Sequence, residues 1–176
     1  KEGIILSGHE IDQLIFNMAQ AIIKNHPGAK GMVLIGIHTG GVFLANRLQA
    51  RIMEEVGVQV PRGDIDISLY RDDWTRIGYH PVIQKTDITF SIDNKDAILV
   101  DDVLFTGRTV RAAMDALIDF GRPKRIELAV LIDRGHRELP IRASYSGMFM
   151  ETLYDQTVNV YLKEISGRDE VAISRP

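Results

Sequence analysis

Two adjacent carboxylates, Asp101 and Asp102, are the residues best suited to chemistry in this chain. They follow an apolar run, residues 97–100, and precede a short loop rich in hydroxyl groups and glycine, after which a helical pattern begins near Thr109. The N–H groups in the first turn of a helix bind anions, and Gly107 lets the backbone approach a phosphate closely. Residues 97–109 therefore predict a strand, a phosphate-binding loop and a helix in succession.

Two acids beside a phosphate-binding loop would repel a bare phosphate, so the ligand must offer them another partner. Vicinal sugar hydroxyls can donate hydrogen bonds to a carboxylate, and a hydrated Mg²⁺ carried by phosphates makes negative charge tolerable there. We infer a ligand with a ribose, a phosphate and a metal-bearing pyrophosphate. No protein group is predicted to ligate the metal on its own: the diphosphate carries the Mg²⁺, with Asp101 or Asp102 as an optional contact. For these residues alone, a strand end followed by a helix cap at Thr106 or Thr109 remains the alternative.

Alternating strands and helices are predicted to position this loop. Continuous apolar runs indicate buried strands at residues 32–37, 97–100 and 126–132, and weaker alternation suggests a further strand at 157–162. Apolar spacing indicates three helices. The first follows the capping box at residues 7–10, the second contains Leu44, Leu48, Ile52 and Val56, and the third contains Val110, Ala113, Met114 and Leu117.

Ile65, Ile67 and Leu69 alternate with polar residues, which predicts a strand with one wetter face. Strands that alternate with helices predict an α/β fold with a mostly parallel central sheet and helices on both faces. Ligands bind beyond the carboxyl ends of the strands in such sheets. The loops after Ile37, Tyr70, Val100 and Ile132 should therefore converge on one site.

Two of these loops carry further residues that could bind the ligand. Thr39, Gly40 and Gly41 would present backbone N–H groups to a diphosphate, although an ordinary turn explains the same residues. Arg71 would pair bidentately with phosphate oxygens, and a solvated charge cluster is its alternative. Residues 71–94 lack sustained periodicity and are predicted to form a flexible lid, in which Lys85 adds charge on closure.

The string at residues 97–109 resembles the phosphoribosyl-diphosphate-binding motif of type I phosphoribosyltransferases. Residues 69–73, 119–123 and 131–143 match one branch of that family, the pyrimidine operon regulators that are also uracil phosphoribosyltransferases. The resemblance runs from about residue 7 to about residue 145. It implies a type I phosphoribosyltransferase fold, an enzyme that converts uracil and phosphoribosyl diphosphate to UMP and diphosphate with Mg²⁺, a homo-oligomer, and a regulator that binds a hairpin in leader mRNA.

The resemblance and the loop chemistry together assign the site residues. Asp101, Asp102 and Arg71 are predicted to be catalytic, and backbone groups around Arg134 are expected to complement the edges of uracil. The predicted substrate-binding set combines both phosphate loops, the lid cations and the loop after the strand at 126–132: Thr39, Gly40, Gly41, Arg71, Lys85, Asp101, Asp102, Val103, Leu104, Phe105, Thr106, Gly107, Arg108, Thr109, Asp133, Arg134 and Val158.

The chain departs from this branch where basic residues are usual. His38 replaces a customary Lys, Gly40 stands where Arg is common, and residues 147–153 are more apolar than their family counterpart. Residues 122–125, Arg47 and Arg51 are the remaining candidates for an RNA-binding face. A purine or other nucleobase phosphoribosyltransferase without an RNA-binding role is the alternative function, and residues 133–142 argue against it.

Composition sets the outer bounds. A chain of 176 residues fits one phosphoribosyltransferase domain, residues 1–176. No apolar run approaches the roughly 20 residues that cross a bilayer, and the apolar stretch near the start is too short for a signal peptide, so we expect a cytoplasmic protein with no membrane partner. The absence of cysteine excludes disulfides, thiolate metal sites and cysteine nucleophiles, and the net charge of −3 gives no overall attraction to RNA.

Overall fold

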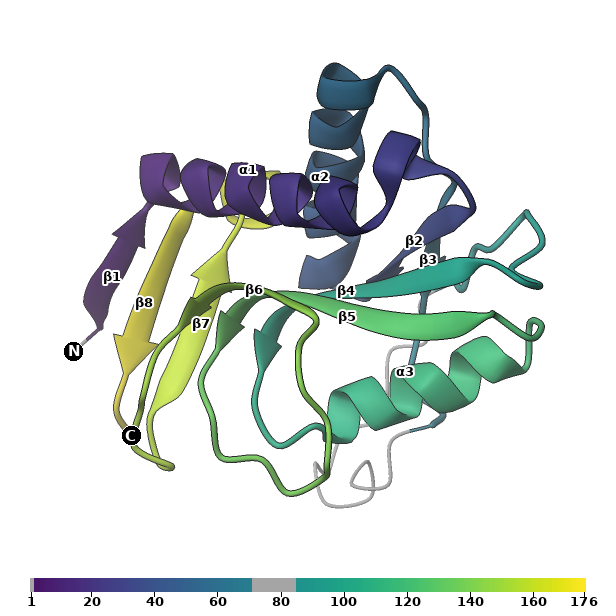
Figure 1. The fold of residues 1–176 in the computed structure, drawn as a ribbon. Helices are drawn as coiled ribbons and strands as arrows, with labels where there is room; N and C mark the ends of the chain where they lie inside the picture. The colour runs from purple at the N-terminus through teal and green to yellow at the C-terminus, as the bar shows by residue number, and fades with distance from the viewer. Residues whose placement is uncertain (1, 71–84) are drawn as a thin grey trace.

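Two β-sheets form the framework of the protein (Figure 1). The computed structural model describes residues 2–70 and 85–176. A five-stranded parallel sheet has the order β3-β2-β4-β5-β6, and a three-stranded antiparallel sheet has the order β1-β8-β7. The strands of the parallel sheet are β2 Met32–Ile37, β3 Arg62–Ile65, β4 Asp96–Leu104, β5 Arg125–Asp133 and β6 Tyr145–Phe149. Those of the antiparallel sheet are β1 Gly3–Ser7, β7 Thr157–Tyr161 and β8 Glu170–Ser174.

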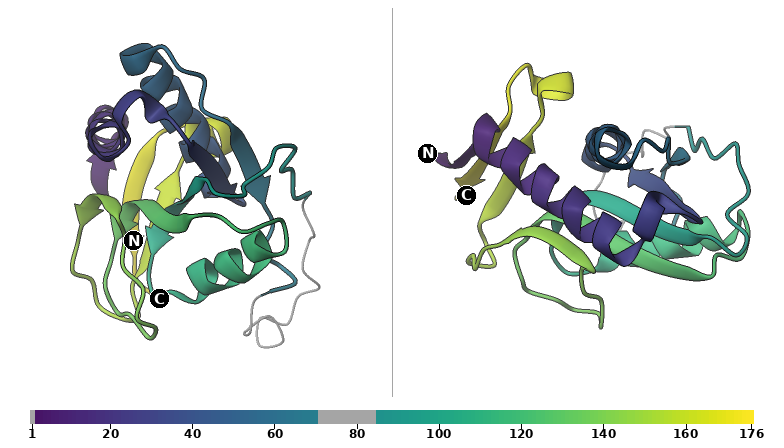
Figure 2. Two further views of the ribbon diagram at one scale, coloured as in Figure 1. Left: turned by 45° about the vertical axis from the view of Figure 1, so that its right-hand side comes forward. Right: turned by 45° about the horizontal axis from the view of Figure 1, so that its top comes forward.

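Helices cover both faces of the parallel sheet, as Figures 1 and 2 show. Helices α1 (Gly8–Asn25) and α2 (Gly40–Val56) pack on one face, and α3 (Arg108–Ile118) packs on the other. Strand β4 is apolar on both sides because Ile98 and Val100 join the core beneath α1 and α2, whereas Ala97 and Leu99 join the core beneath α3. The predicted α/β fold with a mostly parallel central sheet is confirmed. Two short helices, η1 (Pro27–Ala29) and α4 (Lys163–Ser166), complete the described elements.

Local sequence signals account for the helix ends. Ser7 caps α1 by accepting a hydrogen bond from the Glu10 N–H, and the Glu10 carboxylate accepts one from the Ser7 N–H, which confirms the predicted capping box. Helix α2 ends at Gly57, whose φ of 69° suits glycine. Among the described residues, no helix combines the length and apolar character needed to cross a membrane.

The antiparallel sheet was not predicted. Strand β1 is exposed at four of its five positions, so it carries no core-facing pattern. It is held by pairing with β8, which lies at the other end of the chain. The strand expected at residues 157–162 is present as β7, but it belongs to this second sheet. Strand β6 was also missed, because only Tyr145 among its residues is fully buried.

The strand predicted around Ile65, Ile67 and Leu69 lies earlier in the chain. Strand β3 ends at Ile65, and Leu69 is 70% exposed. The Asp66 carboxylate accepts hydrogen bonds from the N–H and the hydroxyl of Ser68. A side chain that binds the backbone two residues later favours a turn over a strand. The prediction was therefore wrong about the extent of the strand, although Ile65 and Ile67 are buried as expected.

The predicted lid, residues 71–94, is described only from residue 85 onward, so residues 71–84 lie outside the described residues. In the described part, Asp87 pairs with Asp64 of β3 through both of its backbone groups. Ile92 is fully buried, and Ile88 and Phe90 pack against the core beneath α3. Residues 87–92 therefore lie along the edge of the sheet, so the predicted lid was wrong for these residues, which are held by backbone pairing and core packing.

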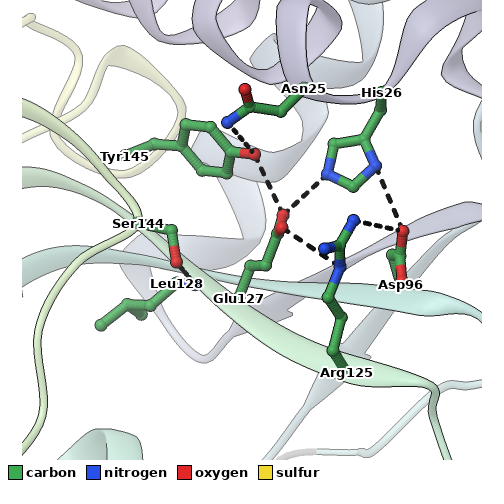
Figure 3. A network of polar contacts seen from close by, with 8 residues as sticks. All are labelled: Asn25, His26, Asp96, Arg125, Glu127, Leu128, Ser144 and Tyr145. Atoms are coloured by element: carbon green, nitrogen blue, oxygen red, sulfur yellow. Dashed lines mark hydrogen bonds and ion pairs between the residues drawn. The ribbon is translucent and has the colours of Figure 1, made fainter.

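A polar network joins α1 to the amino ends of β4 and β5, at the end of the sheet opposite the phosphate-binding loop (Figure 3). One ring nitrogen of His26 lies 2.8 Å from Glu127 Oε2, and the other lies 3.4 Å from Asp96 Oδ2. Arg125 also contacts both carboxylates. The Tyr145 hydroxyl donates a hydrogen bond to Glu127, and burial raises the pKa of Tyr145, so this hydroxyl keeps its proton at neutral pH. The network is structural, because it lies away from the candidate site.

Candidate active site at the carboxyl edge of the sheet

A cavity of about 450 Å³ opens at the carboxyl ends of the central strands. It unites three segments that are distant in sequence: the β2–α2 loop, the turn after β3 and the end of β4. Its lining residues are His38, Thr39, Gly40, Asp66, Ile67, Ser68, Asp101, Asp102, Val103 and Thr109. Of the four loops expected to converge here, the segments after Ile37 and Val100 line the cavity, and the residues directly after Tyr70 lie outside the described residues. The turn after β3, residues 66–68, also lines the cavity, whereas the loop after Ile132 does not contribute to its lining.

Asp101 and Asp102 lie within β4 rather than after it, because the strand extends to Leu104. Asp101 is 6% exposed, and its Oδ1 accepts a hydrogen bond of 2.9 Å from the Asp102 N–H. Asp102 Oδ1 accepts a hydrogen bond of 2.8 Å from the Val103 N–H. Each carboxylate is thus oriented by the backbone of the next residue. Both line the cavity.

Glycine allows the β2–α2 loop to approach these acids. The peptide bond between His38 and Thr39 is cis, and α2 begins at Gly40. A Cβ at Gly40 would lie 2.6 Å from Asp102 Oδ2, and one at Gly41 would lie 2.1 Å from the Val100 carbonyl oxygen. The first turn of α2 therefore lies directly against Asp102 and the β4 backbone, and Gly40 and Asp102 line the cavity together. The amino end of a helix at this place favours an anion.

We expect the Gly41→Ala variant to lose both stability and transferase activity. Its Cβ would overlap the β4 backbone, and overpacking of this kind typically costs about 1–3 kcal/mol of the free energy of unfolding. Urea unfolding and a diphosphate-release assay would measure the two effects. Gly3→Ala is the matched control, because a Cβ at Gly3 meets no atom within 4 Å. Equal unfolding midpoints for the two variants would contradict this account.

The loop that is predicted to bind phosphate has the expected conformation between β4 and α3. Gly107 precedes α3 with a φ of 94°, a conformation that favours glycine. The Arg108 N–H donates a hydrogen bond of 3.4 Å to Thr106 Oγ1, and Thr109 lines the cavity. The Arg108 guanidinium contacts Glu138 through Nε and Nη2, at 3.1 and 3.0 Å. Arg108 therefore links this loop to the loop after β5.

Asp133 does not present its polar groups to the cavity. Its carboxylate binds the Arg137 guanidinium through both oxygens, at 2.9 and 2.7 Å, and also accepts a hydrogen bond from the Gly135 N–H. Its backbone carbonyl accepts a hydrogen bond from the Met150 N–H. Arg137 also donates hydrogen bonds to the carbonyl oxygens of Phe105 and Ile141. Asp133 thus shapes the loop after β5, and a role in substrate binding remains a prediction.

Arg134 is 5% exposed and lies beside the end of β4, since its N–H donates a hydrogen bond to the Leu104 carbonyl. Its guanidinium carbon lies 4.0 Å from the centre of the Phe105 ring. Nε donates a hydrogen bond of 3.0 Å to Thr152 Oγ1, and Nη2 donates one of 2.9 Å to the Leu153 carbonyl. Val158, at 8% exposure, lies in β7, which contacts β4. The residues predicted for the nucleobase side are therefore distributed around the end of β4.

Several residues of the site escaped the sequence analysis. Asp66 and Ser68 occupy the polar positions between Ile65, Ile67 and Leu69, so the alternation itself could have identified them. The neighbour of His38 could not have been identified from the sequence: its Nε2 lies 3.2 Å from the Lys85 carbonyl, which brings Lys85 to the loop that lines the cavity. Arg71 lies outside the described residues.

Solved structures with a similar fold are phosphoribosyltransferases. The hypoxanthine phosphoribosyltransferase of Trypanosoma cruzi, in a ternary substrates complex, has a TM-score of 0.76 at 22% identity and covers 98% of this chain and 95% of its own. A hypoxanthine-guanine phosphoribosyltransferase of Bacillus anthracis has a TM-score of 0.73 at 20% identity and covers 98% of both chains. At these identities the likeness establishes the fold alone.

Sequence relatives are closer. Residues 3–164 match the model of the phosphoribosyl transferase domain. The "Bifunctional protein PyrR" of Desulfosudis oleivorans is 56% identical over 177 residues, covering 100% of this chain and 98% of the relative. The protein of the same name from Deinococcus radiodurans is 51% identical over 175 residues, covering 99% and 96%. The chain therefore belongs to the phosphoribosyl transferase domain family and, within that family, to the bifunctional PyrR proteins.

Proposed function

We propose that this protein transfers the phosphoribosyl group of phosphoribosyl diphosphate to uracil, and that it also regulates pyrimidine biosynthesis genes by binding RNA in response to uridine nucleotides. The observation that carries the enzymatic part is the cavity at which Asp101 and Asp102 meet the glycine loop of α2 and the first turn of α3. Identity of about one half with proteins named bifunctional PyrR supports both parts.

Each loop binds a different part of phosphoribosyl diphosphate in this proposal. The ribose hydroxyls donate hydrogen bonds to Asp101 and Asp102. The 5′-phosphate binds at Thr106, Gly107 and the first turn of α3, and the diphosphate binds the N–H groups of Gly40 and Gly41. Arg71 and Lys85, from the segment between β3 and β4, supply positive charge to the diphosphate. The whole chain acts in this proposal as one domain.

The cavity suits a hard cation, because the oxygen-bearing side chains of Asp66, Asp101 and Asp102 line it together. Within the described ranges no three His, Cys, Asp or Glu side chains are arranged to hold an ion by themselves, so the diphosphate would supply the remaining oxygen ligands. When bound, Mg²⁺ would neutralise charge on the leaving diphosphate. Asp101 or Asp102 would be the residue that contacts it.

The reaction needs positioning more than a protein nucleophile. The bond between C1 of the ribose and the diphosphate oxygen weakens, and positive charge develops on the sugar as in glycoside hydrolysis. Asp101 and Asp102 favour that charge, and the N–H groups of α2 favour the charge on the leaving group. Uracil nitrogen then bonds to C1. Exclusion of water by the closed site protects the activated sugar from hydrolysis.

A base-selectivity assay tests the enzymatic proposal. We expect diphosphate release that requires uracil and Mg²⁺, that stops with a chelator and that resumes when Mg²⁺ is restored. Hypoxanthine, adenine and orotate are the comparison substrates. Activity with hypoxanthine and none with uracil would support the purine alternative instead.

We favour Arg122 and Lys124 over Arg47 and Arg51 as the RNA-binding residues. Arg47 donates hydrogen bonds to Glu164 and Asp169, a pairing that lowers the pKa of Glu164. Arg51 contacts Glu54. Arg122 and Lys124, by contrast, are exposed beside an apolar groove of about 780 Å³ formed by Ile118, Gly121, Arg122, Pro123, Arg125 and Ile126. Cations beside apolar side chains suit RNA phosphates and unpaired bases.

We expect the protein to bind a leader-RNA hairpin of its pyrimidine genes more tightly with UMP than without it, and more weakly as salt increases. The double variant Arg122→Ala/Lys124→Ala should bind more weakly, whereas Arg51→Ala should bind like the unaltered protein. Gel-shift titrations with a scrambled hairpin measure both effects. Equal affinity for the two RNAs would contradict sequence-specific binding.

We also propose that the protein forms a homo-oligomer, whose mass light scattering would measure.

A further inference from the structure

Arg134 is a buried cation without a carboxylate partner among the described residues. Its hydrogen bonds go to neutral oxygens, the Thr152 hydroxyl and the Leu153 carbonyl. The acids in its own loop are engaged elsewhere, because Asp133 binds Arg137 and Glu138 binds Arg108. Its third nitrogen, Nη1, makes no hydrogen bond within residues 2–70 and 85–176. Arg134 as a whole residue is 5% exposed, and burying a cation without an anionic partner is unfavourable. A ligand that offers a hydrogen-bond acceptor or negative charge to Nη1 would therefore be stabilised there.

The surrounding residues hold this guanidinium in place without neutralising it. Thr152 is itself 6% exposed, and its carbonyl lies 2.6 Å from His136 Nε2. Thr152 therefore contacts both Arg134 and His136 in the loop after β5. The Phe105 ring lies against the guanidinium, and this contact attracts the cation while contributing no net charge. Burial lowers the pKa of Arg134, yet arginine remains protonated in proteins. The positive charge is therefore retained beside Phe105, the residue that follows β4.

We propose that the uncompensated charge of Arg134 activates the nucleobase by stabilising uracil as its conjugate base, and that Thr152 is the positioning residue that makes this possible. The inference rests on the proposed uracil transfer and adds the source of the nucleophile. The N1 proton leaves to solvent, and the negative charge spreads onto the carbonyl oxygens of the ring, which are the acceptors that a guanidinium binds. The N1 electron pair then forms the bond to C1, and the electron pair of the C1–oxygen bond leaves with the diphosphate.

A charge placed beside Arg134 tests this role without removing the arginine. Thr152→Asp would pair with the guanidinium and neutralise it, whereas Thr152→Asn has a similar size and no charge. We expect the Asp variant to have a kcat/KM for uracil about tenfold or more below that of the Asn variant. The KM for phosphoribosyl diphosphate should be similar in both variants, because the phosphate loops are unchanged.

Base acidity and pH give readouts that a purely structural defect would not move. The base 5-fluorouracil is more acidic than uracil, so it needs less help to ionise, and the ratio of its kcat/KM to that of uracil should rise in Thr152→Asp but not in Thr152→Asn. Neutralising Arg134 also makes bound uracil harder to ionise, so the acid limb of the pH profile should move to higher pH. Thr152→Ser, which keeps the hydroxyl, should behave like the unaltered protein.

The outcomes separate this inference from the proposed function. Equal losses with uracil and 5-fluorouracil, or identical behaviour of the Asp and Asn variants, would overturn the role of Arg134 while uracil transfer stands. Failure of the unaltered protein to use either pyrimidine would instead overturn the proposed function. Urea unfolding of each variant shows whether a lost activity reflects a lost fold.

Discussion

Replacing Asp102 by Asn is expected to reduce uracil transfer by about 10²–10³-fold, or ~3–4 kcal/mol of transition-state stabilisation. The carboxylate lines the cavity beside Gly40, where its charge favours the positive charge that develops on the ribose. Asn retains an oxygen that can accept the hydrogen bond from the Val103 N–H, so the strand should keep its geometry. Asp101→Asn should reduce transfer by a similar factor, for the same electrostatic reason. Its Oδ1 accepts a hydrogen bond from the Asp102 N–H, and an Asn oxygen can accept the same bond.

Steady-state transfer of radiolabelled uracil measures these losses. Asp115→Asn is the matched control, because Asp115 is exposed on α3 and does not line the cavity. Unfolding curves should be similar for all three variants. If Asp101→Asn and Asp102→Asn turned over at nearly the control rate, the two acids would serve only the end of the strand, which is the alternative that the sequence left open.

The largest loss of stability is expected for His26→Ala. The His26 side chain is 2% exposed and lies between the carboxylates of Asp96 and Glu127, which are 11% and 14% exposed. Removing one partner from a buried ionic network typically destabilises a protein by about 3–5 kcal/mol. Arg125 would remain beside both carboxylates, but its side chain is 52% exposed and is therefore a weaker partner than the buried imidazole. Loss of the ring would also remove the contacts of His26 that tie the end of α1 to β4 and β5 (Figure 3).

Urea unfolding monitored by circular dichroism would give this free energy. His9→Ala provides the comparison, since His9 is an exposed histidine on the same helix and its loss should change stability by less than ~0.5 kcal/mol. Similar midpoints for His26→Ala and His9→Ala would mean that the network contributes nothing to the docking of α1. Activity of folded His26→Ala should persist, because the network lies at the end of the sheet away from the cavity.

Local patterns predicted the parts of the site that local geometry builds. The strand, loop and helix at residues 97–109 are present because an apolar run, a glycine with a positive φ and amphipathic spacing act within a few residues of one another. The capping box of α1 is equally local. The residue types predicted the turn that leads into Gly40 and Gly41 at the start of α2. The reason for glycine at position 41 is tertiary, because any larger residue there would place a Cβ against the β4 backbone.

By itself, the sequence determined the parallel sheet, its covering helices and the edge at which the candidate site lies, because hydrophobic periodicity and turn chemistry are properties of neighbouring residues. Only the tertiary structure decided how the two ends of the chain pair as β1 and β8, since no exposed strand encodes its partner locally. It also decided which acids meet which arginines. Glu138 faces Arg108 and Asp133 faces Arg137, which leaves Arg134 uncompensated beside Thr152. The distances that choose these pairs exist only after the strands have brought the loops together.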